Sequence, residues 1–396
     1  MKIALDARWI FEETSGIGQH TRLLIQGLAA LDTRHEGLLL FDDAERAEEV
    51  KASCACDWPH EVLPYGLFSV ANQFKLPRLL RAAGVDLYHS TNYMMPLWGF
   101  PRHRPGTVRA VITVHDLIPM VFRDHAPKSL KSRLYPVYAW LMREVAARAD
   151  ALITVSESSR DDIIRLLRLP EKSKDKVRVV YNGLHPRYTP DAAVARKDPP
   201  EILYVGRLDP YKNVPQLVSA FGECWKSLPA GTRLRIIGPP DERYPEAMTI
   251  ARQLELFPRM DWEGHVDDAT LLDAYRRASV VVLPSHYEGF GLPVAEAMAC
   301  GTPVICSNAS SLPEVAGDAA VYVPPGDLHA LSDALVEVLT TPHTLDRLAA
   351  AGLERAARFS VGAMARDTLA VYENLLPPSP DQGETTNHPP HSRRQP

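Results

Sequence analysis

The 396-residue chain has the composition of an ordinary globular protein, with 45% hydrophobic and 23% charged residues. Its length is sufficient for two or three domains with sizeable cores. The net charge of −5 gives no overall basic field, which argues against nucleic acid as a partner.

Neither a targeting segment nor a metal cluster is expected. After Met1 and Lys2 the chain runs directly into an apolar segment, and no stretch reaches the ~18 to 20 apolar residues of a membrane span. We therefore expect a cytoplasmic protein without a signal peptide or a transmembrane anchor. The five cysteines are odd in number and scattered, which predicts free thiols in a reducing compartment. Cys54 and Cys56 lack the neighbouring ligands that a metal site would need.

The first predicted elements are a strand at residues 2–7 and, after a loop, a helix with apolar residues three or four positions apart. Gly16 and Gly18 precede this helix, and a strand, a glycine loop and a helix in that order can hold a phosphate on backbone amides. A tight turn before a helix is the alternative interpretation. Thr21 replaces the third glycine of a dinucleotide fingerprint, and no acidic residue is clearly placed after the next strand, at 38–41.

Strands and helices then alternate through the first half of the chain. Strands are predicted at 87–89, 108–114, 152–155 and 177–181, and helices at 70–83, 128–149 and 157–169. This alternation predicts a parallel sheet with helices on both faces, which binds ligands beyond the carboxyl ends of its strands. Residues 90–93 and His115-Asp116 directly follow strands and are candidates for that position. His115 could equally be a structural histidine bonded to a neighbouring turn.

Residues 185–199 are polar and contain prolines, which is typical of a linker between domains. The alternation then restarts. Strands are predicted at 202–205, 234–237, 260–266, 280–283, 303–306 and 321–323, and helices at 214–225, 244–256, 269–278, 294–299, 328–340, 344–359 and 361–376. The final twenty residues, 377–396, are rich in proline and polar residues and are predicted to be disordered.

Two cations, Arg207 and Lys212, lie in the loop between the first strand and the first helix of the second half. A helix start with two nearby cations can bind one anion. A solvated surface pair is the alternative, although a loop at the end of a strand favours the anion site.

The stretch at 284–307 predicts a strand, loop, helix and strand, with Glu288 in the loop and Glu296 one turn inside the helix. Gly289 and Gly291 would let a ligand approach the backbone, and the helix start would attract a phosphate. Carboxylates do not bind phosphate, so the natural partners of the two glutamates are hydroxyl groups. Together these features predict a site for a sugar nucleotide.

Residues 128–143 interleave basic and aromatic side chains on a predicted helix. Such a helix can lie on an anionic lipid surface, which leads us to expect peripheral membrane contact as one interpretation. The other is a helix packed on its own sheet, with its charges solvated. The residues concerned are Lys128, Leu130, Lys131, Arg133, Leu134, Tyr135, Val137, Tyr138, Trp140, Leu141 and Arg143.

Short motifs run through the whole chain around the pair Glu288 and Glu296. In order, they are Asp6-Ala7-Arg8, Gly16-Ile17-Gly18, His115-Asp116, Asn182-Gly183, Gly206-Arg207-Leu208 with Lys212, Gly264-His265-Val266, Gly301-Thr302-Pro303-Val304 and Pro313-Glu314-Val315. This series resembles the retaining glycosyltransferases of family four, which have the GT-B fold and a Glu-x7-Glu motif. The resemblance covers essentially all of residues 1–376.

The resemblance implies an α/β protein of two Rossmann-like domains whose parallel sheets face each other across a cleft. Residues 1–184 would form the acceptor-side domain and residues 200–359 the nucleotide-sugar-binding domain, with the linker at 185–199. The helix at 360–376 would cross back to the first domain. Closure of the two domains around the donor is then expected.

The resemblance also implies roles for residues of the second domain. Arg207 and Lys212 would hold the diphosphate and neutralise the departing group. Glu296 would bind the ribose hydroxyls, and Glu288 the hydroxyls of the transferred sugar. Val266 would contact the base. The backbone of the loop after Glu288 would also hold the sugar, through Gly289, Phe290, Gly291 and Leu292.

From the first domain, the resemblance implies that His115 reaches the donor sugar and that Gly16 and Gly18 approach the diphosphate. The sequence contains no Asp-x-Asp triplet, so neither a divalent metal nor another cofactor is expected and the cations must come from the protein. The leaving phosphate itself would take the proton of the acceptor.

The combination of Asp-Ala-Arg, Gly-Ile-Gly and His-Asp-Leu-Ile-Pro is most similar to bacterial mannosyltransferases of O-antigen or exopolysaccharide assembly. It implies GDP-mannose as donor, with UDP-glucose or another UDP-hexose as the rival. The implied acceptor is a sugar on a polyprenyl diphosphate lipid.

Three other functions remain alternatives. A dinucleotide-dependent oxidoreductase would need the full glycine fingerprint and an acidic ribose ligand. A non-catalytic partner of GT-B shape is disfavoured by the presence of Arg207, Lys212, Glu288 and Glu296. A sugar-nucleotide epimerase on the same scaffold lacks support from the loop that contains Glu288.

Overall fold

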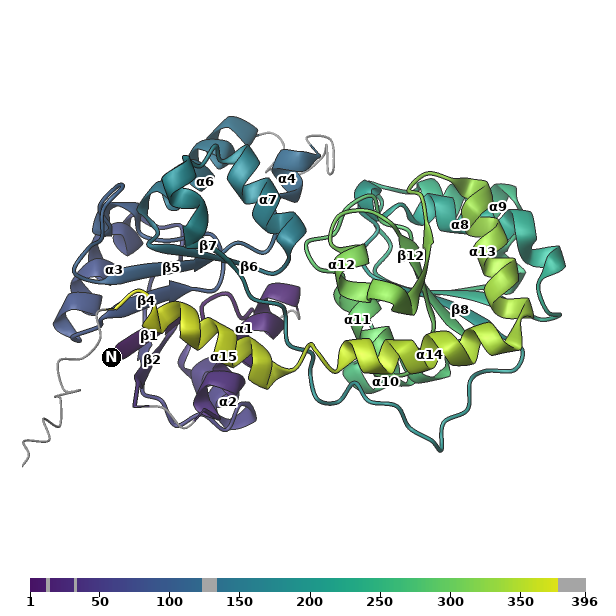
Figure 1. Cartoon of the computed structure of the whole chain (residues 1–396), viewed down its shortest axis with the longest axis horizontal. Helices are drawn as coiled ribbons and strands as arrows, with labels where there is room; N and C mark the ends of the chain where they lie inside the picture. The colour runs from purple at the N-terminus through teal and green to yellow at the C-terminus, as the bar shows by residue number, and fades with distance from the viewer. Residues whose placement is uncertain (12–14, 32–33, 123–133, 377–396) are drawn as a thin grey trace, which may run out of the picture.

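The computed structural model describes residues 1–11, 15–31, 34–122 and 134–376. Two α/β domains, each built on its own parallel sheet, lie side by side and are joined by two passages of the chain (Figure 1). The predicted α/β class with two Rossmann-like domains is confirmed.

Within the described residues, seven strands form the sheet of the first domain, in the order β3-β2-β1-β4-β5-β6-β7, and neighbouring strands run parallel. The order reverses direction beside β1, so loops after β1 and β4 meet at the carboxyl edge. The strands are β1 (Lys2–Asp6), β2 (Glu36–Phe41), β3 (His60–Val62), β4 (Leu87–Ser90), β5 (Arg109–Thr113), β6 (Ala151–Thr154) and β7 (Val177–Val179).

Helices cover both faces of this sheet (Figure 1). Successive residues of β1 enter opposite cores: Ala4 packs in one cluster, while Ile3 and Leu5 pack in the other. The helices are α1 (Gly16–Ala29), α2 (Ala44–Ser53), α3 (Val70–Ala82), α4 (Ile118–Val121), α6 (Tyr135–Arg148) and α7 (Glu157–Leu166), with short 3₁₀ helices η1 (Leu97–Gly99) and η2 (Glu171–Lys176).

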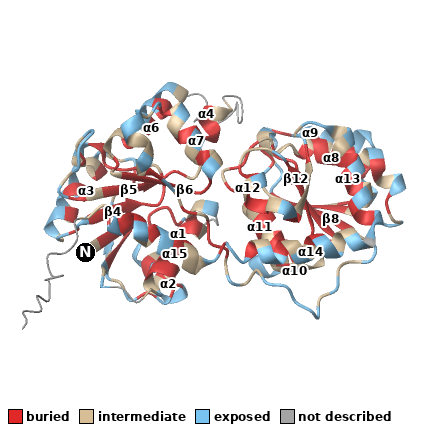
Figure 2. Cartoon of the chain, viewed as in Figure 1, coloured by how far each residue is buried: buried red, intermediate tan, exposed pale blue. Residues whose placement is uncertain are grey.

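In the second domain, the described residues form a six-stranded parallel sheet in the order β10-β9-β8-β11-β12-β13. Its central strands are deeply buried (Figure 2), and Val280 to Leu283 are completely inaccessible. The strands are β8 (Glu201–Val205), β9 (Arg233–Ile237), β10 (Met260–Glu263), β11 (Val280–Leu283), β12 (Val304–Ser307) and β13 (Ala320–Val323).

The helices of the second domain again lie on both faces of the sheet (Figure 1). They are α8 (Val214–Cys224), α9 (Glu246–Gln253), α10 (Asp268–Arg277), α11 (Leu292–Ala299), α12 (Leu312–Ala316), α13 (Leu328–Thr340) and α14 (Pro342–Ala356), with 3₁₀ helices η3 (Pro210–Lys212), η4 (Trp225–Ser227), η5 (Phe257–Arg259) and η6 (Gly317–Ala319).

The last helix, α15 (Val361–Glu373), leaves the second domain and lies across the first (Figure 1). Its Ala365 packs so closely on α1 that a Cβ on Gly27 would come within 2.7 Å of the Cβ of Ala365. Where the two chain passages meet, the amide of Leu184 donates to the carbonyl of Phe359 at 2.8 Å. The two connections therefore lie side by side between the domains.

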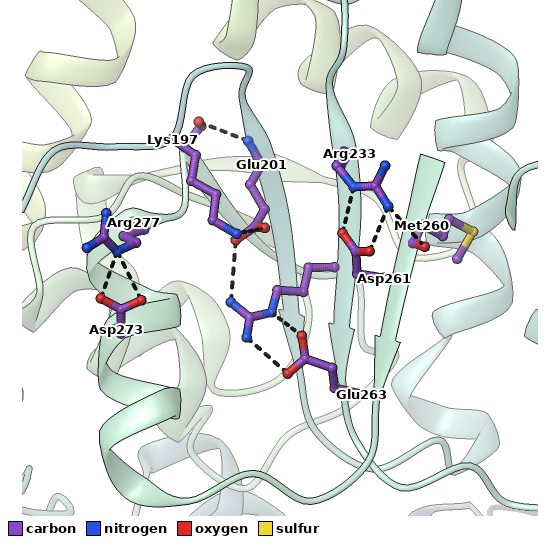
Figure 3. Close-up of polar contacts among 10 residues, drawn as sticks. Lys197, Glu201, Arg233, Met260, Asp261, Glu263, Asp273 and Arg277 are labelled. Atoms are coloured by element: carbon purple, nitrogen blue, oxygen red, sulfur yellow. Dashed lines mark hydrogen bonds and ion pairs between the residues drawn. The ribbon is translucent and has the colours of Figure 1, made fainter. Parts of the chain in front are cut away.

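Polar side chains tie the strands of the second sheet together on one face (Figure 3). Arg233 on β9 makes a bidentate pair with Asp261 on β10, and both N–O distances are 2.6 Å. Glu201 on β8 is 2% exposed and forms an ion pair with Lys197, which lies in the chain just before this strand. The chain entering the second domain is thus anchored by a buried charge.

The structure differs from the predicted elements mainly at short or polar segments. Strand β3 and helix α2 were missed; β3 is a mostly exposed edge strand, and α2 buries only two residues, so neither has a clear apolar period. The strand predicted at 260–266 ends at Glu263. The predicted disorder of 377–396 and the first part of the helix at 128–149 lie outside the described residues.

All five cysteines are buried thiols, and burial raises the pKa of each. Among the helices that the structure describes, none is long and apolar enough to cross a membrane.

Candidate active site

A buried ion pair joins two loops at the carboxyl edge of the second sheet. Lys212, at the end of η3, donates from Nζ to both carboxylate oxygens of Glu288, at 2.7 and 2.8 Å. The hydroxyl of Ser285 donates to Oε1 of the same carboxylate at 2.6 Å. Glu288 is 6% exposed, so its charge is held by these donors rather than by water. The sequence placed both residues near a ligand but did not predict that they pair.

Arg207 lies in the same loop as Lys212, as predicted, but its guanidinium has a different partner. Its Nε is 3.0 Å from Oδ2 of Asp209, and its side chain is 68% exposed. The two cations therefore share a loop while each faces its own carboxylate. Arg207 is the more available of the two for an incoming anion.

The helix start after Glu288 has the backbone that the glycines were expected to allow. Gly291 is the N-cap of α11 with φ of +97°, and Pro293 follows in the first turn. A Cβ on Gly291 would lie 2.6 Å from a methyl group of Leu312, so the site has no room for a side chain. In the first turn of α11, Pro293 has no N–H and the amide of Val294 donates to the carbonyl of Gly291 at 3.0 Å, which leaves the amide of Leu292 as the donor that could face a ligand.

Glu296 projects from α11 into a polar corner made by two tyrosines. The hydroxyl of Tyr275 donates to its Oε2 at 2.7 Å, and the hydroxyl of Tyr188 is a second donor. Burial raises the pKa of Glu296, and these hydroxyl groups oppose that rise by stabilising the carboxylate. The carboxylate is thus fixed in orientation before any ligand binds.

The first domain brings the start of α1 to the same place. Gly18 donates its amide to the Oγ of Ser15 at 3.1 Å, which caps the helix. A Cβ on Gly16 would lie 3.9 Å from Leu292 at the start of α11. The N-termini of α1 and α11, each of which carries a positive dipole end, therefore lie next to each other at the boundary between the domains.

His115 also meets the second domain. A Cβ on Gly289 would lie 2.8 Å from the carbonyl oxygen of His115, so the loop after β5 touches the loop that contains Glu288. The Nε2–H of His115 donates to the carbonyl of Thr91 at 2.9 Å, which leaves Nδ1 as an acceptor. Burial lowers the pKa of His115, so the ring is neutral at neutral pH. The ring of His115 thus makes a structural hydrogen bond, while its backbone borders the loop that contains Glu288.

Further contacts hold the two domains together beside the site. The Oγ of Ser156, the N-cap of α7, donates to the carbonyl of Gly289 at 2.7 Å. The carboxylate of Glu314, in the second domain, accepts the amides of Glu157 and Ser158 at the start of α7, at 2.7 to 3.3 Å. This carboxylate acts as a helix cap supplied by the other domain.

Two predicted site residues direct their side chains elsewhere. Val266 packs on the core of the second domain, and Phe290 packs edge-to-face on Phe359 with ring centroids 5.3 Å apart. Phe290 is buried, whereas Val266 is only partly buried. The carbonyl of Phe290 already accepts a hydrogen bond from Ser311 at 3.0 Å.

A small pocket, with a cavity volume of about 20 Å³, lies between the domains beside Glu296. Its walls come from α1, from the end of the first domain and the start of the linker, and from α11. Its lining residues are Gln19, His20, Leu23, Asn182, Gly183, Leu184, His185, Tyr188, Leu292 and Glu296.

Several residues of this region were not predicted from the sequence, because their roles depend on contacts between distant segments. Tyr188 comes from the linker and Tyr275 from α10, and neither belongs to a recognisable motif. Ser285 carries a weak signal, since it lies two residues after the end of the buried strand β11.

The expectation that no acidic residue is clearly placed after the second strand of the first domain is wrong. Asp42 and Asp43 do follow β2 directly, where a dinucleotide-binding protein would have its acidic ribose ligand. Asp43 accepts the amide of Arg46 at 2.8 Å as the N-cap of α2, and Asp42 pairs with the guanidinium of Arg46 at 3.0 Å. Both carboxylates therefore serve the start of α2. Among the described residues, no group of three or more His, Cys, Asp or Glu side chains is arranged to hold a metal ion.

Family models match both halves of the chain. The model of glycosyltransferase family 4 matches residues 14–188, and the model of group 1 glycosyl transferases matches residues 189–355. The O-antigen chain mannosyltransferase B of Escherichia coli is 31% identical over 307 residues, which is 73% of this chain and 74% of that protein. The chain belongs to the family 4 glycosyltransferases.

This glycosyltransferase is also similar to a glycogen synthase of Mycobacterium tuberculosis, with 34% identity over 386 residues and 90% of each chain covered. Among solved structures, it shares its fold with a sucrose-phosphate synthase of Thermosynechococcus elongatus, with a TM-score of 0.72, 23% identity and coverage of 94% and 98%. HepE of Anabaena, solved with UDP and glucose, gives a TM-score of 0.71 at 17% identity, with coverage of 94% and 100%. The predicted GT-B fold is confirmed.

Proposed function

We propose that this glycosyltransferase moves a hexose, with retention of configuration, from a nucleotide diphosphate to a sugar acceptor. The observation that carries the proposal is the buried carboxylate of Glu288, fixed by Lys212 and Ser285 and in contact, through Gly289, with the loop of His115. A carboxylate has about four lone-pair positions, and three are used here. The remaining one can accept a hydroxyl of the transferred sugar.

In this proposal the diphosphate lies between the starts of α1 and α11 and is held by Arg207 and Lys212. The exposed Arg207 reaches it from solvent, whereas Lys212 must share its ammonium group between Glu288 and phosphate. Because Lys212 bridges the two, it would link sugar binding to stabilisation of the leaving group. Glu296, oriented by two tyrosine hydroxyls, would bind the ribose. The leaving phosphate takes the acceptor proton, and the protein supplies the cations without a metal.

We further propose mannose from GDP-mannose as the transferred sugar and a polyprenyl-diphosphate-linked glycan of bacterial surface polysaccharide as the acceptor. The E. coli O-antigen mannosyltransferase supports this choice. The similarity to a glycogen synthase supports UDP-glucose or another UDP-hexose as the second candidate.

A panel of nucleotide sugars in a thermal unfolding assay tests the donor. GDP-mannose is expected to raise the Tm of the wild type by several degrees, because a ligand that binds only the folded state stabilises it. Lys212→Ala and Glu296→Ala are expected to lose this increase. A rise with UDP-glucose alone would favour the second candidate, and a rise with NAD(P) alone would contradict the proposed function.

The lipid-linked acceptor leads us to propose peripheral membrane contact through residues 128–143. Of this segment the structure describes residues from Leu134 onward; Lys128, Lys131 and Arg133 lie outside the described residues. On α6 and just before it, Leu134, Val137 and Trp140 are exposed by 49, 57 and 54%. Exposed apolar side chains beside basic residues fit an anionic lipid surface.

Sedimentation with vesicles tests this surface. We expect the wild type to co-sediment at low salt with vesicles that contain anionic lipid, and Val137→Ser with Trp140→Ser to weaken binding at least about tenfold through lost apolar burial. Leu254→Ser removes an equally exposed apolar residue of the second domain and serves as the control. Failure of the wild type to sediment would contradict membrane contact.

A further inference from the structure

One buried side chain in the pocket between the domains has a hydrogen-bonding atom that the proposed function does not use. His20 lies on the second turn of α1 and is 6% exposed. Its Nδ1 is 2.9 Å from Oδ1 of Asn182. Its Nε2 is buried, and within the part of the chain that the structure describes it has no hydrogen-bond partner. A polar atom left in this way is unfavourable unless something else satisfies it.

The contact with Asn182 determines what that partner must be. An amide oxygen only accepts hydrogen bonds, so Nδ1 of His20 carries the hydrogen and Nε2 keeps its lone pair. Burial, and then the neighbouring His115, lower the pKa of His20 well below its usual range. The ring is therefore neutral at neutral pH, and its Nε2 requires a donor such as a hydroxyl group. A phosphate oxygen is excluded as a partner because it is itself an acceptor.

The surroundings of His20 indicate which hydroxyl group is within reach. His20 lines the same pocket as Glu296 and Leu292 of the second domain. On its other side, its ring meets the ring of His115 edge-to-face, with centroids 4.7 Å apart. Neither Glu288 nor Lys212 lines this pocket, whereas Glu296, the proposed ribose ligand, does.

We propose that His20 is a donor-binding residue of the first domain, whose Nε2 accepts a hydrogen bond from a ribose hydroxyl of the nucleotide held by Glu296. This inference rests on the proposed function, because it requires a nucleotide in the cleft. The ribose then contacts α1 of one domain and α11 of the other. Nucleotide binding alone, without the transferred sugar, is thereby linked to the approach of the two domains.

A binding cycle tests the hydrogen bond. Calorimetry measures the affinities of the full chain and of His20→Phe for GDP and UDP and for their 2′-deoxy and 3′-deoxy forms. Phenylalanine keeps a ring against His115 but removes the acceptor. For the nucleotide that the wild type binds, we expect His20→Phe to weaken binding about fivefold to tenfold. For one of the two deoxy forms, the same substitution should change affinity less than twofold, because the hydroxyl is already missing.

The outcomes separate this inference from the function on which it rests. An equal loss with the parent nucleotide and with both deoxy forms, or no loss at all, would show that His20 is structural and would overturn the inference alone. Failure of the wild type to bind either UDP or GDP would overturn the proposed function as well. His20→Leu, measured in the same cycle, replaces His20→Phe if the latter does not fold.

Discussion

Replacing Lys212 with alanine is expected to lower kcat/KM for sugar transfer by about 10²- to 10³-fold, the usual cost of losing one preorganised donor to a developing negative charge. The same change should destabilise the second domain by about 3 to 5 kcal/mol, because it leaves the carboxylate of Glu288 buried without its counter-ion. Steady-state kinetics with the cognate sugar nucleotide and chemical denaturation measure the two effects.

A double variant separates these effects. Lys212→Met with Glu288→Gln removes both charges, and replacing both members of a buried pair is often neutral for stability. We expect the double variant to regain most of the lost stability while transfer remains impaired. Lys172→Ala, at an exposed lysine of the first domain, is the control that should change neither quantity. Recovery of transfer together with stability would contradict a role of Lys212 in the reaction.

Replacing Glu314 with alanine is expected to favour the open arrangement of the two domains. Its carboxylate accepts two amides at the start of α7, at 2.7 to 3.3 Å across the domain boundary. A partly exposed contact of this kind contributes about 1 to 2 kcal/mol, which corresponds to about a 5- to 30-fold change in the ratio of closed to open molecules. X-ray scattering should show a larger radius of gyration, and KM for the donor should rise by a similar factor.

Glu157→Gln is the matched control for this second prediction. Glu157 is an exposed carboxylate of the same helix turn that pairs with Arg160 within α7 and keeps its amide for Glu314. We expect the radius of gyration and the donor KM of Glu157→Gln to match those of the wild type. An unchanged radius of gyration in Glu314→Ala would show that other contacts, such as the hydrogen bond from Tyr287 to Asp162 at 2.6 Å, are sufficient to hold the domains.

Much of the fold could be predicted from the sequence because buried parallel strands are short apolar runs separated by helical periods. The position of Glu288 and Glu296, eight residues apart across a helix start, could be predicted for the same reason, since both lie in one local unit. The elements that were missed, β3 and α2, bury few apolar side chains and leave a weak period.

What the sequence could not show is how distant segments complete the site. The hydroxyls that orient Glu296 come from Tyr188 in the linker and Tyr275 on α10. The cap that Glu314 supplies to α7 joins residues 157 positions apart. His20 offered no local signal, because its unused Nε2 becomes evident only when Asn182 is seen to hold the other nitrogen.

Transfer of a hexose with retention is tested most directly by NMR of the sugar first released from a nucleotide donor. The full chain is incubated with GDP-mannose and, in parallel, with UDP-glucose, and the anomeric signals are followed before mutarotation. We expect consumption of one donor, release of its nucleoside diphosphate and an α-configured first product. A β-configured first product, or no consumption of any sugar nucleotide in a panel that also contains other UDP-hexoses, would contradict retaining transfer by this protein.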